Sequence, residues 1–310
     1  MAIPSNQLDI WARQGATTTA KTTHESVRAA LEHGSSLIKN RLSDKTVEIH
    51  LQGSYKDDTN IYGDSDVDIL VELNSTFGHS AHELPDSQKL AHDSAYKSAD
   101  YDWKDFRRDV IISLEKYYGK SLIDSSGSKS IKLLPKPGRI KADIVPVIRY
   151  RKYNYFHNIG NYNAERGVKL YNVTTEESIV NYPHHHFNNG CAKNAKERTN
   201  GLFKPVVRII KNARTHLVNS GIIEEGKAPS YFLQSLIYNV PDENFVLNYE
   251  TSIFNVLKYL YTTPIDNFVC QNEMHALFPT SGVSATQWNK QNAVDAIVAL
   301  VNLWDNWSKS

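Results

Sequence analysis

Apolar and polar residues alternate along two short stretches in the first quarter of the chain. Val47, Ile49 and Leu51 alternate with polar neighbours, which is typical of a β-strand with one buried face. The same alternation returns over residues 67–73, where the polar neighbours include acids. Because the polar segment from Gly53 to Gly63 separates the two stretches, we predict two consecutive strands that pair like a hairpin.

Apolar residues at three- and four-residue steps predict helices on both sides of these strands. Thr22 and Glu25 have the spacing of a capping box, and the apolar positions that follow predict a helix reaching Leu42. A second, longer helix is predicted from Pro85 to Gly119, because the apolar spacing persists and glycine is a common residue just after a helix.

Two more strands and two loops complete the first half of the pattern. Residues 131–134 and 140–148 are apolar-rich and surround a turn at residues 135–138, which predicts a further strand pair. Residues 74–83 are polar and residues 151–173 are rich in Asn and Tyr. We predict a mobile loop for the first of these segments and a connecting loop for the second.

The second half of the chain has mainly helical spacing. Apolar stripes run over residues 206–217, 233–240 and 294–304. The predicted fold class is therefore α+β, with a mixed α/β lobe over residues 1–170 and an α-helical lobe over residues 171–310.

Composition limits the kind of protein that this chain can be. The 310 residues are 40% hydrophobic and 22% charged, which is ordinary for a globular protein with a sizeable core. The net charge of +1 does not favour a large nucleic-acid-binding surface, so we expect no stable nucleic-acid partner.

Cysteine content and apolar runs indicate where the protein works. Cys191 and Cys270 are far apart, which excludes a disulfide framework and suits a reducing compartment. The chain begins without the features of a signal peptide, and no apolar run reaches the roughly 18 residues that a membrane span needs. We therefore expect a cytoplasmic protein without a membrane partner.

Three aspartates form the strongest chemical signal. Residues two apart on a strand point to the same side, so Asp66 and Asp68 present neighbouring carboxylates. A third acid, Asp143, lies within another predicted strand of the same lobe. Oxygen ligands without His or Cys suit Mg²⁺ or Mn²⁺, and three such acids suit a two-metal site acting on phosphate. We interpret Asp64 as a turn-capping residue.

Gly53 and Ser54 precede the acidic strand and suit phosphate binding. A glycine allows the backbone to approach a phosphate closely, and a hydroxyl with nearby amides can bind phosphate oxygens. Taken alone, the pair would be read as an ordinary turn.

Together these residues carry a resemblance to a known family. The pattern Gly-Ser-x(11)-Asp-x-Asp with a distant third Asp resembles the nucleotidyltransferase superfamily of polymerase β. Residues 182–194, 203–214 and 229–233 narrow the resemblance to the bacterial cyclic GMP–AMP-synthase-like nucleotidyltransferases, the CD-NTases. It covers roughly residues 20 to 300 and implies a polymerase β-like lobe with a helical lobe closing over a nucleotide pocket.

The resemblance implies a role for each matching residue. Lys211 matches a helical lysine that contacts the donor triphosphate, Ser230 a second phosphate contact, and Tyr231 an aromatic residue that stacks on a base. The implied metal ligands are Asp66, Asp68 and Asp143, and the implied phosphate contacts are Gly53 and Ser54. The residues alone leave two alternatives open: Lys211 lies on a solvated basic helix face, and Tyr231 packs in the core.

Two further segments contain side chains that can bind ligands. Asn181 has an amide that can donate and accept, so we consider it a reader of a base edge, with capping of a local turn as the alternative. Three consecutive histidines, His184 to His186, cannot easily converge on one zinc ion, and we interpret His186 as structural.

The resemblance implies an enzyme that condenses nucleoside triphosphates into a cyclic di- or trinucleotide signal in anti-phage defence of the CBASS type. Its implied cofactor is two Mg²⁺ ions, which Mn²⁺ can replace, and its implied partners are the triphosphates, a downstream effector activated by the product, and a regulatory protein. Two alternatives stay open: a synthase of linear products or modifier of tRNA, and an inactive sensor that binds nucleotide or RNA.

Overall fold

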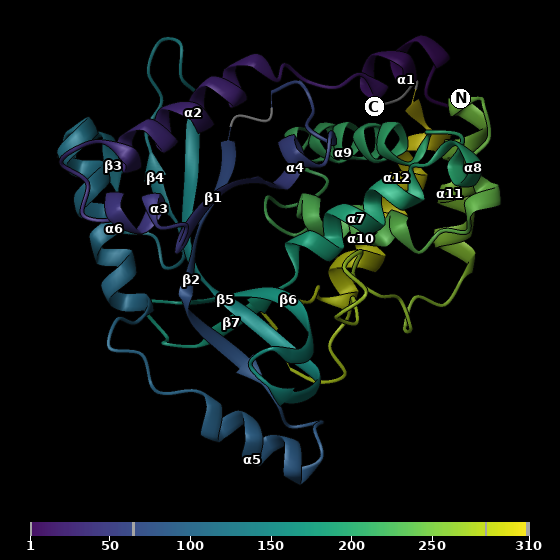
Figure 1. Ribbon diagram of the computed structural model, residues 1–310. Coiled ribbons are helices and arrows are strands. Elements are labelled where there is room, and N and C mark those ends of the chain that lie inside the picture. The colour runs from purple at the N-terminus through teal and green to yellow at the C-terminus, as the bar shows by residue number, and fades with distance from the viewer. Residues whose placement is uncertain (1, 64–65, 283, 308–310) are drawn as a thin grey trace. The chain divides into compact units, whose positions relative to one another are not determined.

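The computed structural model describes residues 2–63, 66–282 and 284–307, and the chain forms two compact units (Figure 1). The sheet unit contains Thr17–Gln52 and Ser65–Pro183. The helical unit contains Met1–Ala16, Gly53–Asp64 and His184–Ser310. The helical unit therefore includes two N-terminal segments, which the division into residues 1–170 and 171–310 assigned to the other lobe.

The sheet unit is built on a mixed sheet in which seven strands are described. The strand order is β1-β2-β5-β4-β3, and β6 pairs with both β5 and β7. Among the strands described, β2 and β5 are the one parallel pair. The strands are β1 (Val47–Gln52), β2 (Asp66–Ser80), β3 (Ile123–Asp124), β4 (Ile131–Leu133), β5 (Lys141–Asn158), β6 (Asn161–Tyr171) and β7 (Ser178–Asn181).

The strand pairs predicted from sequence are confirmed, but two predicted loops are wrong. β1 pairs antiparallel with β2, and β4 with β5. However, β2 continues to Ser80 and β5 continues to Asn158, where it pairs with β6. Tyr153 and Phe156 are buried there, so the aromatic residues that suggested a loop instead fill a small core.

Helices cover one face of this sheet. α2 (Thr18–Glu32) and α6 (Trp103–Tyr118) pack on each other and on β2 and β5. On β2, Val67 and Ile69 are fully buried toward the helices, which leaves the intervening side chains on the other face. The unit also contains α3 (Lys39–Ser43), α5 (Asp86–Ala95) and the short 3₁₀ helix η1 (Lys120–Leu122).

Two helix predictions require correction. Thr22 lies inside α2, where its hydroxyl donates to the carbonyl of Thr18, so it caps nothing. The long helix from Pro85 is two helices, because Asp102 accepts a hydrogen bond from the backbone N–H of Asp105 and starts α6 anew. Gly119 ends α6 with φ of 87°, as expected.

The helical unit packs around a core that includes the N-terminus. In α9, the predicted apolar stripe from Val206 to Leu217 is buried. In α12, Ile297 and Trp304 of the predicted stripe are buried, whereas Val294 is 36% exposed. The elements are α1 (Ser5–Ala12), α4 (Gly53–Lys56), α7 (Pro183–Lys193), α8 (Lys196–Thr199), α9 (Phe203–Asn219), α10 (Ser230–Tyr238), η2 (Asp242–Asn244), α11 (Tyr249–Thr262) and α12 (Lys290–Asp305).

None of the helices in the described ranges has the length and apolar character required to cross a membrane.

Candidate active site

The three aspartates named from the sequence lie on two adjacent strands of the sheet unit. Asp66 and Asp68 begin β2, and Asp143 is the third residue of β5. Because β2 and β5 are parallel neighbours, Asp68 is directly in register with Asp143, and Asp66 with Lys141. All three acids lie on the face opposite α2 and α6, since the alternate residues of β2 and β5 are buried toward those helices.

A polar row extends from these acids across neighbouring strands. Gln52 of β1 is in register with Asp68, and Lys132 of β4 is in register with Asp143. Residues paired in register point to the same face, so the row presents an amide, two carboxylates and an ammonium side by side. Sequence analysis missed Gln52 and Lys132, because only the register between strands identifies them.

Two oxygen atoms of this row lack hydrogen-bond partners within the described part of the chain. They are Oδ1 of Asp143 and Oε1 of Gln52, and both are buried. A buried oxygen without a donor is costly, so such an atom in a native site is an indication of a ligand.

The electrostatics of the row favour a bound cation. Burial raises the pKa of Asp143, the charge of Lys141 opposes this effect, and the negative charge of Asp66 adds to it. The Lys141 ammonium donates to Asp66 Oδ2, and this bond raises the pKa of Lys141. The Lys141 ammonium thus neutralises part of the negative charge at Asp66. Asp143 Oδ1, by contrast, accepts no hydrogen bond from the described residues.

The residues present fit a hard divalent ion. Asp66, Asp68 and Asp143 supply only carboxylate oxygens, and one of those oxygens is buried without a donor. Mg²⁺ and Mn²⁺ prefer such ligands. These three acids would hold the ions that the sequence analysis expects.

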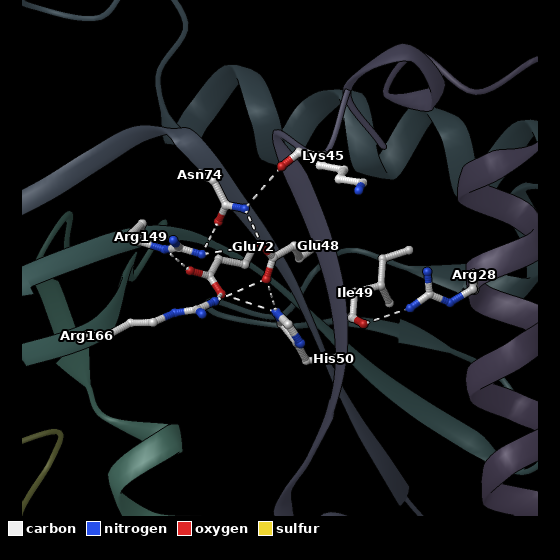
Figure 2. Close-up of polar contacts among 9 residues, drawn as sticks. All are labelled: Arg28, Lys45, Glu48, Ile49, His50, Glu72, Asn74, Arg149 and Arg166. Carbon is white, nitrogen blue, oxygen red and sulfur yellow. Dashed lines mark hydrogen bonds and ion pairs between the residues drawn. The ribbon is translucent and has the colours of Figure 1, made fainter. Parts of the chain in front are cut away.

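An ion-pair network lies farther along the same face of the sheet (Figure 2). Glu72 is only 1% exposed and accepts hydrogen bonds from Arg149 (2.6 Å) and Arg166 (2.8 Å). Arg166 also reaches Glu48 at 3.2 Å, and His50 lies 3.3 Å from Glu72. The network joins β1, β2, β5 and β6, and therefore fixes the strands that carry the acids relative to one another.

The charge of Glu72 is retained despite its burial. Burial alone would raise its pKa, but hydrogen bonds from His50 and Arg149, together with the charge of Arg149, lower the pKa to about 2. Glu72 is therefore ionised at neutral pH and holds both guanidinium groups.

In the helical unit, the structure brings Lys211 to the segment that contains Gly53 and Ser54. Gly53 has φ of 68°, in the left-handed region that favours glycine, and it begins α4. The segment then turns back, with the N–H of Thr59 donating to the carbonyl of Ser54. The Lys211 ammonium is 1% exposed and donates to the carbonyl of Thr59 at 2.8 Å.

The other basic residues of α9 also contact this N-terminal segment. Lys204 pairs with Asp58 at 2.9 Å. Arg208 donates to the carbonyl oxygens of Ala12 and Asp58. The basic face of α9 is thus engaged in contacts that hold the segment in place, rather than being a solvated surface.

Ser230 and Tyr231 lie at the beginning of α10, directly after Pro229, as predicted. The Ser230 hydroxyl accepts a hydrogen bond from Arg214 at 3.1 Å. The Tyr231 ring stacks on His186, with centroids 4.9 Å apart and planes 18° apart. Burial raises the pKa of Tyr231, which therefore stays a neutral phenol at physiological pH.

His186 has a structural environment. Its Nε2 lies 3.2 Å from Asp57 Oδ2 and 3.2 Å from the Gln234 amide, in the interior of the helical unit. His184 is exposed, so neighbouring histidines of the run occupy different environments.

Asn181 ends β7 in the sheet unit. It pairs with Val168 across the ladder, and its side-chain oxygen accepts the N–H of Tyr182 at 2.8 Å. A Cβ on Gly167 would come within 2.9 Å of the Asn181 carbonyl, so this approach of β6 to β7 requires glycine. The local hydrogen bond agrees with the turn-capping alternative.

Comparison with known proteins defines the class of protein as a nucleotidyltransferase. Residues 188–305 match the cGAS/DncV-like nucleotidyltransferase C-terminal helical domain. The chain is 39% identical over 309 residues to the cyclic UMP-AMP synthase of Rhodothermus marinus (strain SG0.5JP17-172), covering 100% of both proteins. It is 36% identical over 314 residues to cyclic nucleotide synthase CdnE01 of Staphylococcus haemolyticus, covering 99% of this chain and 100% of that protein.

A solved structure agrees with the sequence matches. The Rhodothermus marinus CdnE c-UMP-AMP synthase with Apcpp and Upnpp superposes with a TM-score of 0.84 at 38% identity, covering 99% of this chain and 98% of that one. The chain therefore belongs to the cGAS/DncV-like nucleotidyltransferases, the CD-NTases. The expected family and α+β fold class are confirmed, and the chain is an enzyme of the group that synthesises cyclic nucleotides.

Proposed function

We propose that this chain condenses two or three nucleoside triphosphates into a cyclic nucleotide, with Asp66, Asp68 and Asp143 as its catalytic acids. One observation carries the assignment of the acids: Asp68 and Asp143 are in register on parallel strands, and Asp143 Oδ1 is buried without a donor among the described residues. The similarity to a cyclic UMP-AMP synthase over the whole chain supports the reaction.

The reaction joins one nucleotide to the next by phosphoryl transfer. A ribose hydroxyl oxygen bonds to the α-phosphorus of a triphosphate, the bond from that phosphorus to pyrophosphate breaks, and the hydroxyl proton is released. A second transfer within the linear intermediate closes the ring. Bound Mg²⁺ or Mn²⁺ would supply positive charge that stabilises the phosphate oxygens and the leaving pyrophosphate.

The chain's own residues would hold the reacting groups. Asp66 and Asp68 would bind both ions, and Asp143 would bind the ion near the attacking hydroxyl. The network around Glu72 keeps β2 and β5 in fixed register, which such a site needs because small misplacements of reacting atoms are costly.

We assign nucleotide contacts to the residues that the family resemblance indicates. Gly53 and Ser54 would contact phosphate oxygens, and Ser230 would be a second phosphate contact. Tyr231 would stack on a base. Lys211 would act on the triphosphate as a positive charge, which its bond to the carbonyl of Thr59 holds beside the Gly53 segment.

The first substrates to test are ATP and UTP, because the similar protein of Rhodothermus marinus is a cyclic UMP-AMP synthase. The product would activate a downstream effector in CBASS-type signalling, and a regulatory protein would control synthesis. Asn181 is the proposed reader of a base edge.

Product analysis tests the proposal. The purified protein is incubated with Mg²⁺ and the four triphosphates, singly and in pairs, and products are identified by mass spectrometry. A cyclic product lacks one water relative to the linear molecule with a terminal monophosphate, so the two differ in mass. Linear products or transfer to tRNA would show instead a synthase of linear products or a modifier of tRNA. If no mixture releases pyrophosphate with Mg²⁺ or Mn²⁺, the chain is an inactive sensor that binds nucleotide or RNA.

A further inference from the structure

A second cluster of metal-ligand side chains lies in the sheet unit, at the far end of β2 from the catalytic aspartates. It consists of His79 near the end of β2 and of His92 and Asp93 in α5. Each residue offers one ligand atom, and these atoms all lie within 4.8 Å of one another. The His79 and His92 ring centroids are 4.3 Å apart.

His92 is an unusual residue to anchor a helix. It is 1% exposed and is the single buried residue of α5, a helix that is described along its whole length. Its ring contacts the aromatic rings of Tyr96, Tyr153 and Phe156. Helices of this kind are usually anchored by aliphatic side chains, because burying an imidazole carries a desolvation cost.

The Nδ1 atom of that buried ring lies beside a carboxylate, 3.1 Å from Asp93 Oδ1. Two ligands of a tetrahedral zinc ion, each 2.0–2.1 Å from the metal, lie about 3.3 Å apart. The spacing of the histidine and the carboxylate therefore suits a shared metal ion as well as a hydrogen bond.

Another cluster of histidine and acids in this unit differs, because arginines already bind its carboxylates. Glu48, His50 and Glu72 also place ligand atoms close together. Arg149 and Arg166 already bind the two carboxylates there, so the negative charge is matched. No arginine or lysine bond to Asp93 is present among the described contacts, and that carboxylate faces the two imidazoles.

We propose that His79, His92 and Asp93 bind a zinc-class transition-metal ion, which ties α5 to the end of β2. Two imidazoles and one carboxylate are ligands that Zn²⁺ and its neighbours in the first transition row accept, with water completing the coordination. The catalytic acids, which offer only oxygen, prefer Mg²⁺. The two sites thus differ in the metal that they select.

Zinc titration of the full-length protein without an affinity tag tests the proposal. The protein is treated with a chelator, returned to buffer with millimolar Mg²⁺ to occupy carboxylate-only sites, and titrated with Zn²⁺ by calorimetry. The wild type is expected to bind one Zn²⁺ per chain. His79→Asn and Asp93→Asn are each expected to weaken that binding at least about tenfold, because each loses a ligand.

Both substitutions affect exposed side chains, so the variants should fold, which circular dichroism verifies. His157→Asn is the matched control, since His157 is also exposed and lies in the same unit outside the cluster. A Zn²⁺-dependent rise in melting temperature in the wild type, absent in His79→Asn, is the second readout. Zinc binding that survives both substitutions, as binding to the run from His184 to His186 would, overturns the proposal, and so does the absence of binding.

Discussion

At the scale of single residues, one carboxylate oxygen of Asp143 is buried and has no hydrogen-bond partner among the described residues. Asp143→Asn is expected to lower the rate of cyclic product formation by at least about a hundredfold, since losing even an outer partner of a metal ligand costs 10–100-fold. Its thermal stability should hold or rise, because burial opposes the charge of Asp143. Product yield by mass spectrometry and melting temperature give the two readouts.

Asp86→Asn is a matched control for that substitution, because the Asp86 side chain is 97% exposed. It should retain full activity. Wild-type product formation by Asp143→Asn would remove Asp143 from the proposed metal ligands.

Lys141 would compete with an ion at the proposed site for Asp66. Its ammonium donates to Asp66 Oδ2, so a bound ion would have to displace this bond or share the oxygen. Lys141→Met is therefore expected to tighten Mn²⁺ binding several-fold, as measured by electron paramagnetic resonance of free Mn²⁺. Unchanged or weaker binding would mean that Lys141 supports the site instead of opposing the ion.

Asn181 is the proposed reader of a base edge, so its side chain should influence which base the enzyme incorporates. A pocket that hydrogen-bonds a base edge discriminates strongly, because the wrong base leaves buried polar groups unpaired. We expect Asn181→Ser to change the ratio of the four triphosphates in the product more than it lowers total turnover. Competition assays with labelled triphosphates measure this ratio. If the ratio does not change, the bond from Asn181 to Tyr182 is its main role.

Candidate site residues could be predicted from the sequence where the spacing within one strand identified them. Asp66, Asp68 and the apolar context of Asp143 stand out in the sequence, and the structure lays them on adjacent strands. Gln52 and Lys141 did not stand out, because their relation to the acids depends on register between strands. Register is set by long-range pairing, which a single sequence does not reveal.

At the scale of elements, Glu72 holds four strands together through its ion pairs. Glu72→Gln would replace the carboxylate that binds the partly exposed Arg149 and Arg166 with a neutral amide, so we expect it to lower the free energy of unfolding by about 1–3 kcal/mol at pH 7. Chemical denaturation measures the loss. Glu83→Gln is the control, since the Glu83 side chain is 55% exposed.

The contribution of Glu72 depends on pH in a defined direction. Its folded-state pKa is lowered from 4.5 to about 2, so the stability it provides is present above pH 4.5 and is lost as the pH falls toward 2. The difference in unfolding free energy between wild type and Glu72→Gln should shrink over this window. A difference that is constant from pH 7 to pH 2 would contradict the role of the ionised carboxylate.

Element boundaries were predictable where local signals decided them. The Gly119 end of α6 and the buried stripe of α9 follow from local sequence. The extension of β2 to Ser80 did not, because its backbone hydrogen bonds are completed by β5, which is distant in sequence. The extension of β5 to Asn158 pairs with the adjacent β6, in a segment whose Asn and Tyr content favoured a loop. Strand formation depends on such neighbours more than on intrinsic preference.

At the scale of the whole molecule, the N-terminus is part of the helical core. Leu8 of α1 is fully buried among residues of α9 and α11, while Ile10 of the same helix is 55% exposed. Leu8→Ala is expected to cost about 2–5 kcal/mol of unfolding free energy, and Ile10→Ala about 0.5 kcal/mol or less. Denaturation of both variants gives the comparison. Equal effects would show that α1 does not pack as described.

The division into units could not be predicted from composition. When read in order, residues 1–16 and 53–64 fall in the first lobe, and nothing in their sequence assigns them to the C-terminal helices. Their assignment comes from contacts such as that of Lys211 with Thr59 and that of Arg208 with Ala12. Such contacts join residues about 150 to 200 positions apart, beyond the reach of local patterns.

The packing of α1 also has a consequence during synthesis on the ribosome. Ser5–Ala12 is translated early, but its partner α9 begins only at Phe203. Roughly 190 residues separate the two elements, and translation at about 5–20 residues per second takes roughly 10–40 s to bridge them. Throughout that interval Leu8 and Ile3 lack the core that buries them in the folded protein, so this stretch of the nascent chain keeps its apolar side chains exposed until α9 has been made.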